Sequence, residues 1–469
     1  MSGRLQGPLA GVRVIDCTSV LMGPYATQIM ADLGADVIKV ESPDGDTTRY
    51  LPPGPDATRG GMFLNVNRGK RSLALDLKQP EARAALVRLV EGADVFVHSM
   101  RPGAIQRLGL DYAALKEVNP GLVYANLYGF ARSGPYRDYP AYDDIVQAAS
   151  GLVDLQARLS GGEPTYLATV VADKVTGLTG LYAILAALFA RTRTGEGQEV
   201  EVPMFETLVS FTMIEHLCGS LFDPPQGPPE YPRVTAAARR PYRTKDGHIG
   251  VMIYNDKHWR AFFHAIGDPE WTRDPMFASM RSRTQNIGTV LHKLAEVIEE
   301  RTTAEWIELF RLAEVPAMAI ATPADLLHDE HLEATGFWNE RDSEFGRLRF
   351  PGIPTRFSAT PGAIGDPGPA LAPTAARSWR RRGSTRRRST RWSPVPTGCR
   401  HERARARAPL ARRARRGALP APARPRQRHR LLPAPADGAG QRRRRMGLDR
   451  GERPRHRPRR HRHPSQAAA

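Results

Sequence analysis

The chain has 469 residues, which is enough for two or three domains and a large buried core. Its net charge of +19 suggests a nucleic-acid partner, but residues 373–469 alone hold 31 arginines, no lysine and four acidic residues, a net charge of +27. Residues 1–372 therefore carry a net charge of −8. Nucleic acid is expected only as a non-specific partner of the basic segment.

Cysteine content and apolar runs favour a cytoplasmic protein. The three cysteines, Cys17, Cys218 and Cys399, show no CxxC or metal-ligand spacing, as is typical of reduced thiols, and no metal site is expected. The N-terminal residues lack the apolar segment of a secretory signal. The longest apolar run, Leu178–Ala190, is too short to span a bilayer and predicts a buried support helix.

Strands and helices alternate through the first half of the chain, which favours an α/β fold with a parallel sheet. Strands are predicted at Val12–Cys17, Val37–Glu41, Asp94–His98, Val123–Leu127 and Glu199–Val202, and helices at Gly23–Leu33, from Pro80, and at Gly180–Ala190. The first strand-to-helix turn, TSVLMGP, lacks the GxGxxG pattern that brings a backbone close to a pyrophosphate. NAD binding is therefore not expected.

The segment Asn65–Lys78 is predicted to be a polar, basic loop followed by a short strand. Its cations Arg68, Lys70 and Arg71 could bind phosphate groups. A solvated loop explains the same composition, and the local sequence alone favours that interpretation.

Residues 225–330 are predicted to form a smaller α+β domain after a proline-rich linker, Phe222–Pro232. Its elements are a hairpin at Arg243–Ile253 and helices at Asp256–Ala265, Asn286–Glu300 and Thr302–Leu312. Residues 331–372 are expected to return to the large domain that begins with residues 1–224.

Residues 373–469 contain no Ile, Phe, Tyr, Asn or Lys and cannot bury a core, so they predict a disordered basic tail. Because arginine is the only cation besides histidine, we hypothesise that this tail is translated out of frame.

Seven segments occur in an order that resembles the class III CoA-transferases, the family of formyl-CoA:oxalate and carnitine CoA-transferases and of the related α-methylacyl-CoA racemases. They span Leu9 to about Gly352. The segments are LAGVRVIDCTSVLMGPYATQIMADLGADVIKVE, NRGKRSLALDLK, RPGAIQRLGL, GF-x-x-x-GPY, YDDIVQAASGL, the stretch around Asp173 with TGEGQEVEVPMFET, and PYRTKDGHI.

The resemblance implies a Rossmann-like large domain built from both ends of the chain, a smaller domain between them, and an interlocked homodimer. It also implies transfer of CoA from an acyl-CoA to a free carboxylic acid. The CoA thioester is then a substrate, and no tightly bound cofactor or metal is expected. The final helix that follows a GPAL-like segment in the family is expected to be missing here, because the tail follows Gly368–Leu371 directly.

The resemblance also implies the site residues, with Asp173 as the catalytic aspartate. The positions matched to CoA contacts or to the surroundings of the catalytic acid are Val20, Leu21, Leu75, Asp76, Leu77, Lys78, Ser99, Arg101, Arg107, Tyr142, Asp143 and Met204. Leu75–Lys78 match a strand in the family. Two positions differ from many members, which carry a polar residue at Leu21 and Asn at Ser99.

Asp173 has a structural and a chemical interpretation. Because it precedes a long apolar run that begins at Val175, the local sequence favours an N-cap. The ordered family motifs favour a nucleophile. A carboxylate with an ordinary pKa of about 3.9 is ionised at pH 7 and needs no general base to attack a thioester.

Two alternatives remain. A 2-methylacyl-CoA racemase would need a histidine where this chain has Ala141 and Tyr142, and tyrosine, with a pKa near 10, is a poor proton shuttle at neutral pH. A nucleic-acid-binding protein would act through the arginine-rich tail and bind in a salt-dependent manner.

Overall fold

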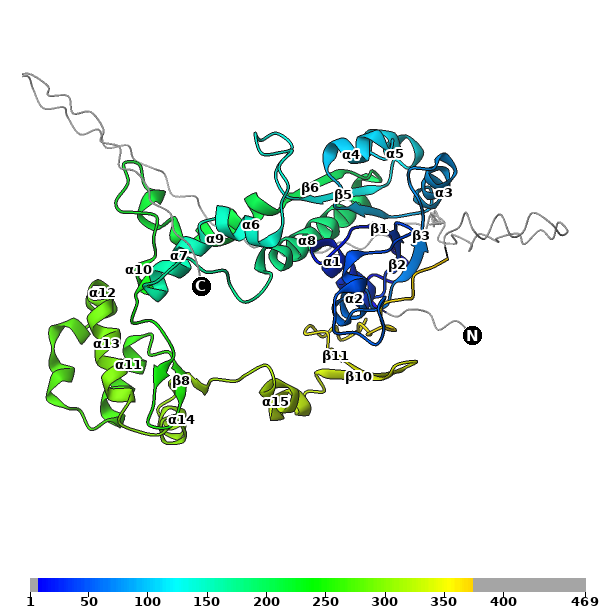
Figure 1. Cartoon of the computed structure of the whole chain (residues 1–469). Helices are drawn as coiled ribbons and strands as arrows, with labels where there is room; N and C mark the ends of the chain where they lie inside the picture. Colours follow the sequence, from blue (N-terminus) through cyan, green and yellow to red (C-terminus); the bar gives the residue numbers. More distant parts are fainter. Residues whose placement is uncertain (1–6, 374–469) are drawn as a thin grey trace, which may run out of the picture. The chain divides into compact units, whose positions relative to one another are not determined.

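The computed structural model describes residues 7–373, so the predicted basic tail lies outside the described residues except for Pro373. Six of the strands form a sheet in the order β3-β2-β1-β4-β5-β6, in which every pair is parallel (Figure 1). The strands are β1 (Arg13–Cys17), β2 (Asp36–Glu41), β3 (Arg71–Ala74), β4 (Val95–His98), β5 (Val123–Tyr128) and β6 (Glu199–Pro203). This is the strand order of the Rossmann fold, and the predicted α/β class is confirmed.

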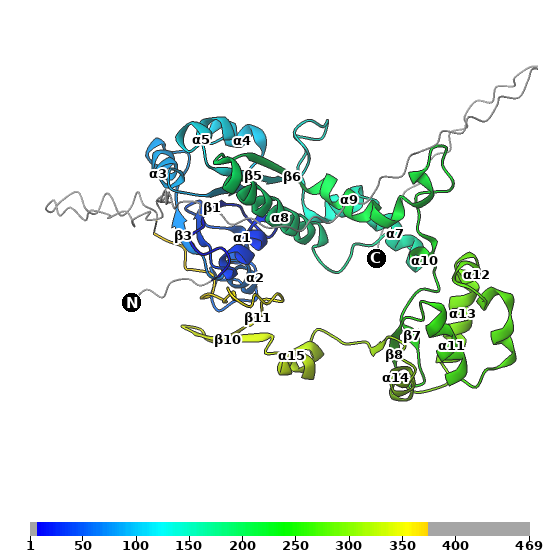
Figure 2. The ribbon, with the colours of Figure 1, turned by 180° about the vertical axis from the view of Figure 1, so that it is seen from behind.

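Helices cover both faces of the sheet, because the strands are apolar on both sides. Alternate residues of β1 show this, since Val14 packs into one core and Ile15 into the other. One face carries α1 (Met22–Asp32) and α8 (Val171–Thr194), and the other carries α3 (Pro80–Val90), α4 (Pro102–Arg107) and α5 (Tyr112–Val118) (Figures 1 and 2).

The strand predicted within Asn65–Lys78 is β3, which ends at Ala74. Leu75–Lys78 were matched to a strand, but they form a turn beyond the end of β3. The pairing of β3 with β2 stops at Ala74, opposite Glu41, which releases the following residues from the sheet. The match to a strand is therefore wrong for these four residues.

Helix α8 is longer and less buried than predicted. It begins at Val171 instead of Gly180 and runs for 24 residues to Thr194 instead of Ala190, and Gly195 after it takes a left-handed conformation with φ +77°. It packs on α1, β5 and β6, yet Tyr182 and Phe189 are 63% and 64% exposed. The predicted buried support helix is thus buried along one face only.

The length and composition of α8 also fit a membrane-crossing helix, and it is the only such helix in the described part of the chain. A core helix of a globular protein meets the same criteria. The residues of α8 that face α1 and the sheet, among them Ile184 and Ala187, belong to the core of the α/β part.

Residues 242–319 form a separate cluster with its own core. The predicted hairpin is confirmed as β7 (Tyr242–Arg243) and β8 (His248–Val251), and a third strand, β9 (Ala317–Ala319), joins it antiparallel to β8. Its helices are α11 (Asp256–Ala265), α12 (Met280–Gln285), α13 (Ile287–Ile298) and α14 (Thr303–Leu312). Thr302 and Glu305 form the capping box that their spacing indicates.

The last described residues bind to the first part of the chain. Ala363 N–H donates to the Asp32 carbonyl at 2.9 Å, and Gly368 N–H donates to the Leu64 carbonyl at 2.9 Å. The remaining elements are α2 (Gly61–Val66), α6 (Asp143–Ala149), α7 (Leu152–Ser160), α9 (Met204–His216), α10 (Pro232–Thr235), α15 (Glu330–Ala334), β10 (Trp338–Ser343) and β11 (Gly346–Pro351). The domain boundaries near residues 224, 330 and 372 stay predictions.

Candidate active site

A cavity of about 700 Å³ opens at the carboxyl ends of β1, β2 and β3. In a parallel sheet this edge, where the strand order reverses between β1 and β4, is the usual place for a ligand. Its wall comes from Cys17–Val20, Lys39–Ser42, Gly45–Thr47, Leu75–Lys78, Met100, Ala104, Arg107, Leu108 and Tyr142.

Seven of the residues expected to contact CoA line this cavity together. They are Val20, Leu75, Asp76, Leu77, Lys78, Arg107 and Tyr142. The turn after β3 and helix α4 thus bring two cations, Lys78 and Arg107, to the same cavity as the apolar side chains of Leu75 and Leu77. A cavity with both kinds of wall suits a ligand that has anionic and apolar parts.

The other predicted contacts lie behind or beside the wall. The Leu21 and Met204 side chains are buried at the first turns of α1 and α9. The Ser99 hydroxyl oxygen accepts the Ser19 N–H at 3.2 Å, so it holds the turn after β1. Arg101 is exposed at the N-cap of α4 and lies outside the residues that line the cavity.

Asp173 occupies the first turn of α8 but does not cap it. The N-cap position is Val170, whose side chain makes no capping hydrogen bond, so the N-cap interpretation is wrong. The Asp173 N–H instead donates to Asp143 Oδ1 at 2.9 Å, across 30 residues of sequence. The carboxylate of Asp173 accepts no hydrogen bond from any residue between 7 and 373.

Asp143 is buried at the start of α6 and is itself held in place. Gln147 donates from Nε2 to Asp143 Oδ2 at 2.6 Å, and the Gln147 Oε1 accepts the Leu167 N–H at 3.0 Å. The preceding residue, Tyr142, lines the cavity. Adjacent residues therefore connect the cavity wall to the amide of Asp173, although Asp173 is not among the residues that line the cavity.

The pKa of Asp173 differs from the ordinary value expected from the sequence. Burial, and then the nearby carboxylate of Asp143, raise the pKa of Asp173 to about 7. Both causes disfavour the charged form, because neither supplies a cation or a hydrogen-bond donor. Asp173 therefore ionises at a higher pH than the ordinary aspartate that the sequence led us to expect.

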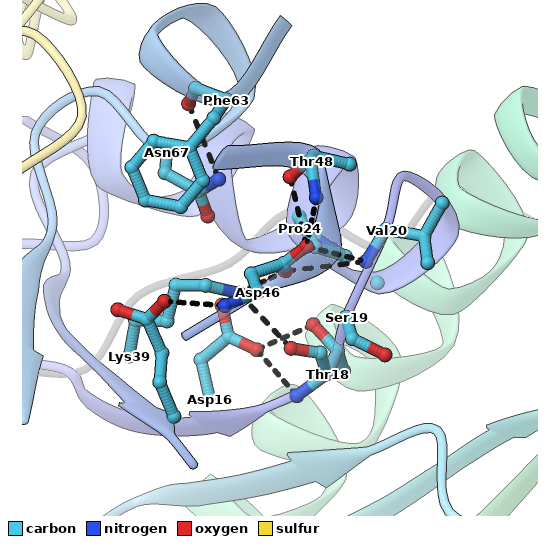
Figure 3. Close-up of polar contacts among 12 residues, drawn as sticks. Asp16, Thr18, Ser19, Val20, Pro24, Lys39, Asp46, Thr48, Phe63 and Asn67 are labelled. Carbon is cyan, nitrogen blue, oxygen red and sulfur yellow. Dashed lines mark hydrogen bonds and ion pairs between the residues drawn. The ribbon is translucent and has the colours of Figure 1, made fainter. Parts of the chain in front are cut away.

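A network of buried charges beside the cavity was not predicted from the sequence (Figure 3). Lys70 Nζ, fully buried, donates to Asp16 Oδ2 at 3.0 Å and to Thr27 Oγ1 at 2.8 Å. Lys39 Nζ lies 2.9 Å from Asp46 Oδ2, also fully buried. The signal was the charged residues among the apolar residues of each strand, Asp16 in VRVIDC and Lys39 in VIKVE.

The basic segment Asn65–Lys78, which contains β3, takes part in such pairs. Arg68 forms a buried ion pair with Asp32 at 2.7 Å, and Arg71 pairs with Asp36 at 2.6 Å on the surface. The buried pairs therefore exclude Arg68 and Lys70 both as solvated side chains and as free phosphate ligands, whereas the Arg71 side chain is 57% exposed and pairs on the surface.

Comparison with known proteins identifies the family. Residues 9–373 match the model of CoA-transferase family III. The succinyl-CoA:mesaconate CoA-transferase of Haloarcula hispanica is 33% identical over 384 residues, which cover 78% of this chain and 94% of that protein. The acetyl-CoA:oxalate CoA-transferase of Acetobacter aceti is 34% identical over 363 residues, which cover 75% of this chain and 90% of that protein.

Solved structures agree with the sequence comparison. The crystal structure of Rv3272 from M. tuberculosis has a TM-score of 0.69 and 30% identity, and the match covers 78% of this chain and 98% of that chain. A CAIB/BAIF family protein from Brucella suis has a TM-score of 0.66 and 30% identity, with 80% and 99% covered. The chain therefore belongs to CoA-transferase family III and is an acyl-CoA:carboxylate CoA-transferase.

Proposed function

We propose that Asp173 is the nucleophile that carries CoA from an acyl-CoA thioester to a free carboxylic acid. One observation carries the proposal, namely that the half-buried carboxylate of Asp173 has no hydrogen-bond partner among residues 7–373. Most buried carboxylates in a folded protein are paired. One that is left unpaired beside a ligand cavity keeps its lone pairs free for a reaction.

The first half of the reaction loads CoA onto the protein. The Asp173 carboxylate attacks the thioester carbonyl, and the C–S bond breaks. The CoA thiolate departs, and an acyl-aspartyl anhydride is formed. The thiolate then attacks the aspartyl carbonyl of that anhydride. This step releases the first acid as its carboxylate and forms an aspartyl-CoA thioester.

The second half reverses these steps with the acceptor acid. The acceptor carboxylate attacks the aspartyl-CoA carbonyl, which gives a second anhydride and again a CoA thiolate. The thiolate attacks the acceptor carbonyl, forms the new acyl-CoA and restores the Asp173 carboxylate. One negative charge is passed along in every step, so no proton is gained or lost.

The ionised form of Asp173 is the form that reacts. Since burial and Asp143 raise its pKa to about 7, transfer should depend on pH around neutrality. Asp143 acts through Asp173 by binding its amide, and we regard it as a positioning residue.

Small carboxylic acids are the proposed substrates. The relatives described above are named for succinyl-CoA and mesaconate and for acetyl-CoA and oxalate, and another relative, from Agrobacterium fabrum, is named for succinate and glutarate. All of these acids are short, and most carry two carboxyl groups. We infer that this chain accepts acids of the same kind, and that it works in the cytoplasm where such thioesters are made.

A homodimer is the proposed assembly, and an apolar surface on α8 and α9 supports it. The surface consists of Leu178, Tyr182, Phe189, Phe211 and Ile214. Ile214 is 83% exposed, although an aliphatic side chain normally gains by leaving water. Sedimentation should show twice the mass of one chain, and Ile214→Glu should weaken the assembly. A monomeric active protein would contradict the homodimer.

A transfer assay tests the proposed function. Wild type and Asp173→Ala are incubated with a panel of acyl-CoA donors and free acids, and the new thioesters are identified by mass spectrometry. Wild type should form a new acyl-CoA, and the variant should lose the activity on the order of 10³-fold or more. Undiminished transfer by Asp173→Ala would refute the mechanism. Inversion of a 2-methylacyl-CoA without transfer would favour the racemase instead.

A further inference from the structure

The turn between β1 and α1 has an unusual backbone. Val20 has a φ of +69°, in the left-handed region that glycine occupies readily and β-branched residues avoid. A residue held in such a conformation persists only where the surrounding structure fixes it, and such residues cluster at functional sites. Thr18, Ser19 and Val20 all line the cavity, so this conformation shapes the cavity wall.

Side chains bind three amides of this turn, and Figure 3 shows two of these bonds, from Thr18 and from Val20. The bonds are Thr18 N–H to Asp16 Oδ1 at 3.0 Å, Ser19 N–H to Ser99 Oγ at 3.2 Å, and Val20 N–H to Asp46 Oδ2 at 3.2 Å. In a dinucleotide-binding turn, such amides point at phosphate groups. Here carboxylate and hydroxyl oxygens occupy them, so the turn serves the ligand through its shape.

Lys39 and Asp46 hold the two ends of the turn together. Lys39 Nζ donates to the Thr18 carbonyl at 3.0 Å and lies 2.9 Å from Asp46 Oδ2, while Asp46 accepts the Val20 N–H. The side chains of Lys39 and Asp46 are 0% and 1% exposed. A buried charge pair of this kind is fixed in geometry, because moving either partner leaves an uncompensated charge.

Asp46 is anchored in turn from behind. Thr48 donates to Asp46 Oδ1 from its N–H at 2.9 Å and from its hydroxyl at 2.8 Å. The Asp46 N–H donates to Glu41 Oε2 at 3.0 Å, and Arg49 binds the same Glu41 carboxylate through two nitrogens. The carboxylate that holds Val20 is therefore fixed on β2 and on the loop that follows it.

We propose that Lys39 and Asp46 are positioning residues that hold Val20 in its left-handed conformation and so keep the cavity wall shaped for the CoA thioester. The ligand in this inference rests on the proposed function. Lys39 and Asp46 belong to the cavity wall, but their side chains are 0% and 1% exposed and act on the backbone of Thr18 and Val20.

A double-mutant cycle with free CoA as the probe tests the inference. Binding is measured by calorimetry for Asp46→Asn in the wild-type background and in a Val20→Gly background. Asp46→Asn should raise the Kd for CoA roughly tenfold in the wild-type background. It should raise the Kd no more than about twofold in the Val20→Gly background, because glycine adopts a positive φ without strain.

A matched control separates positioning from stability. Asp32 forms a buried ion pair with Arg68 at 2.7 Å, at the opposite end of α1 from Val20. Asp32→Asn should lower the unfolding temperature and leave the Kd for CoA unchanged. If Asp46→Asn does not fold, Thr48→Val, which removes one donor to Asp46, should raise the Kd about threefold in the wild-type background and leave it unchanged in the Val20→Gly background.

Three outcomes would overturn the inference. Equal losses of CoA binding in both backgrounds would show that Asp46 does not act through Val20. An unchanged Kd in a less stable Asp46→Asn protein would show a purely structural role. Failure of the wild type to bind CoA at all would overturn the proposed function together with this inference. In the first two outcomes the wild type still binds CoA, so only the inference fails.

Discussion

The buried carboxylates of Asp16 and Asp46 and the half-buried carboxylate of Asp173 have opposite surroundings. Asp16 and Asp46 each face a buried lysine, at 3.0 and 2.9 Å. Burial is the largest cause and raises the pKa of both, but the lysines together with the hydrogen bonds from Thr18, Thr27 and Thr48 outweigh it and hold the pKa of each below its usual range. Asp173 faces another carboxylate and no cation, and its pKa is raised to about 7.

The difference explains how one residue type serves two purposes. A carboxylate that is neutralised by a lysine and by several donors is inert and fixes a backbone. A carboxylate with neither is costly to keep charged, and it is available to react. We infer that the charge of Asp173 lowers the stability of the fold. The ion pairs and hydrogen bonds around β1 and β2 offset this loss.

The largest effect is expected from breaking the network. Lys70 donates to Asp16, Pro24, Thr27 and Asn67, and Lys70→Met would leave the buried Asp16 unpaired. The variant should lose about 3–5 kcal/mol of unfolding free energy. Denaturant unfolding measures it. Lys174→Met, at an exposed lysine, is the control and should change the value by less than about 0.5 kcal/mol. Equal losses of unfolding free energy in Lys70→Met and Lys174→Met would show that the buried network does not stabilise the fold more than an exposed lysine does.

Replacing Asp173 should have a smaller effect on the stability of the fold, and that effect should be a gain instead of a loss. Its pKa is about 7 in the folded chain and 3.8 without the fold, so between these values the folded chain binds more protons than the unfolded one. Stability from this group is therefore present at low pH and is lost as the pH rises through 7. Because asparagine does not ionise, Asp173→Asn should remove this decrease of stability with rising pH.

Thermal unfolding at two pH values checks the sign. Asp173→Asn should raise the Tm by roughly 2–4 °C at pH 8 and by less at pH 5. Asp144→Asn, at the exposed neighbour of Asp143, should show no such pH dependence. A lower Tm for Asp173→Asn at pH 8 would mean that the carboxylate stabilises the fold after all.

The smallest effect is a shift of the pH profile. In wild type, kcat/KM should rise with pH through an apparent pKa of about 7. Asp143→Asn removes the like charge but keeps an oxygen for the Asp173 N–H, so the rise should move to lower pH. Asp144→Asn should leave the profile in place. An unmoved profile in Asp143→Asn would show that Asp143 does not set the pKa.

Much of the fold could be predicted because its signals are local. Apolar runs such as Val12–Cys17 and Val37–Glu41, separated by helical segments, indicated the parallel sheet. The resemblance to the CoA-transferases, and not a local pattern, placed Val20 and Leu75–Lys78 among the expected CoA contacts, and the structure puts all of them at one cavity.

The rest depends on pairs that are distant in the sequence. Lys70 meets Asp16 across 54 residues, and Asp173 meets Asp143 across 30. Neither pair has a local pattern, so Lys70 resembled a solvated cation and Asp173 resembled an ordinary cap. The pKa of Asp173 could not be predicted because it is set by burial and by Asp143.

A chemical trap at Asp173 tests the central claim most directly. The wild-type protein is incubated with succinyl-CoA and hydroxylamine in the absence of an acceptor acid, and its peptides are sequenced by mass spectrometry. Hydroxylamine should intercept the activated aspartyl group and convert Asp173, and no other acidic residue, to a hydroxamate. Two results would contradict the account: an unmodified Asp173 in protein that does transfer CoA when an acceptor acid replaces hydroxylamine, or a hydroxamate on Asp143.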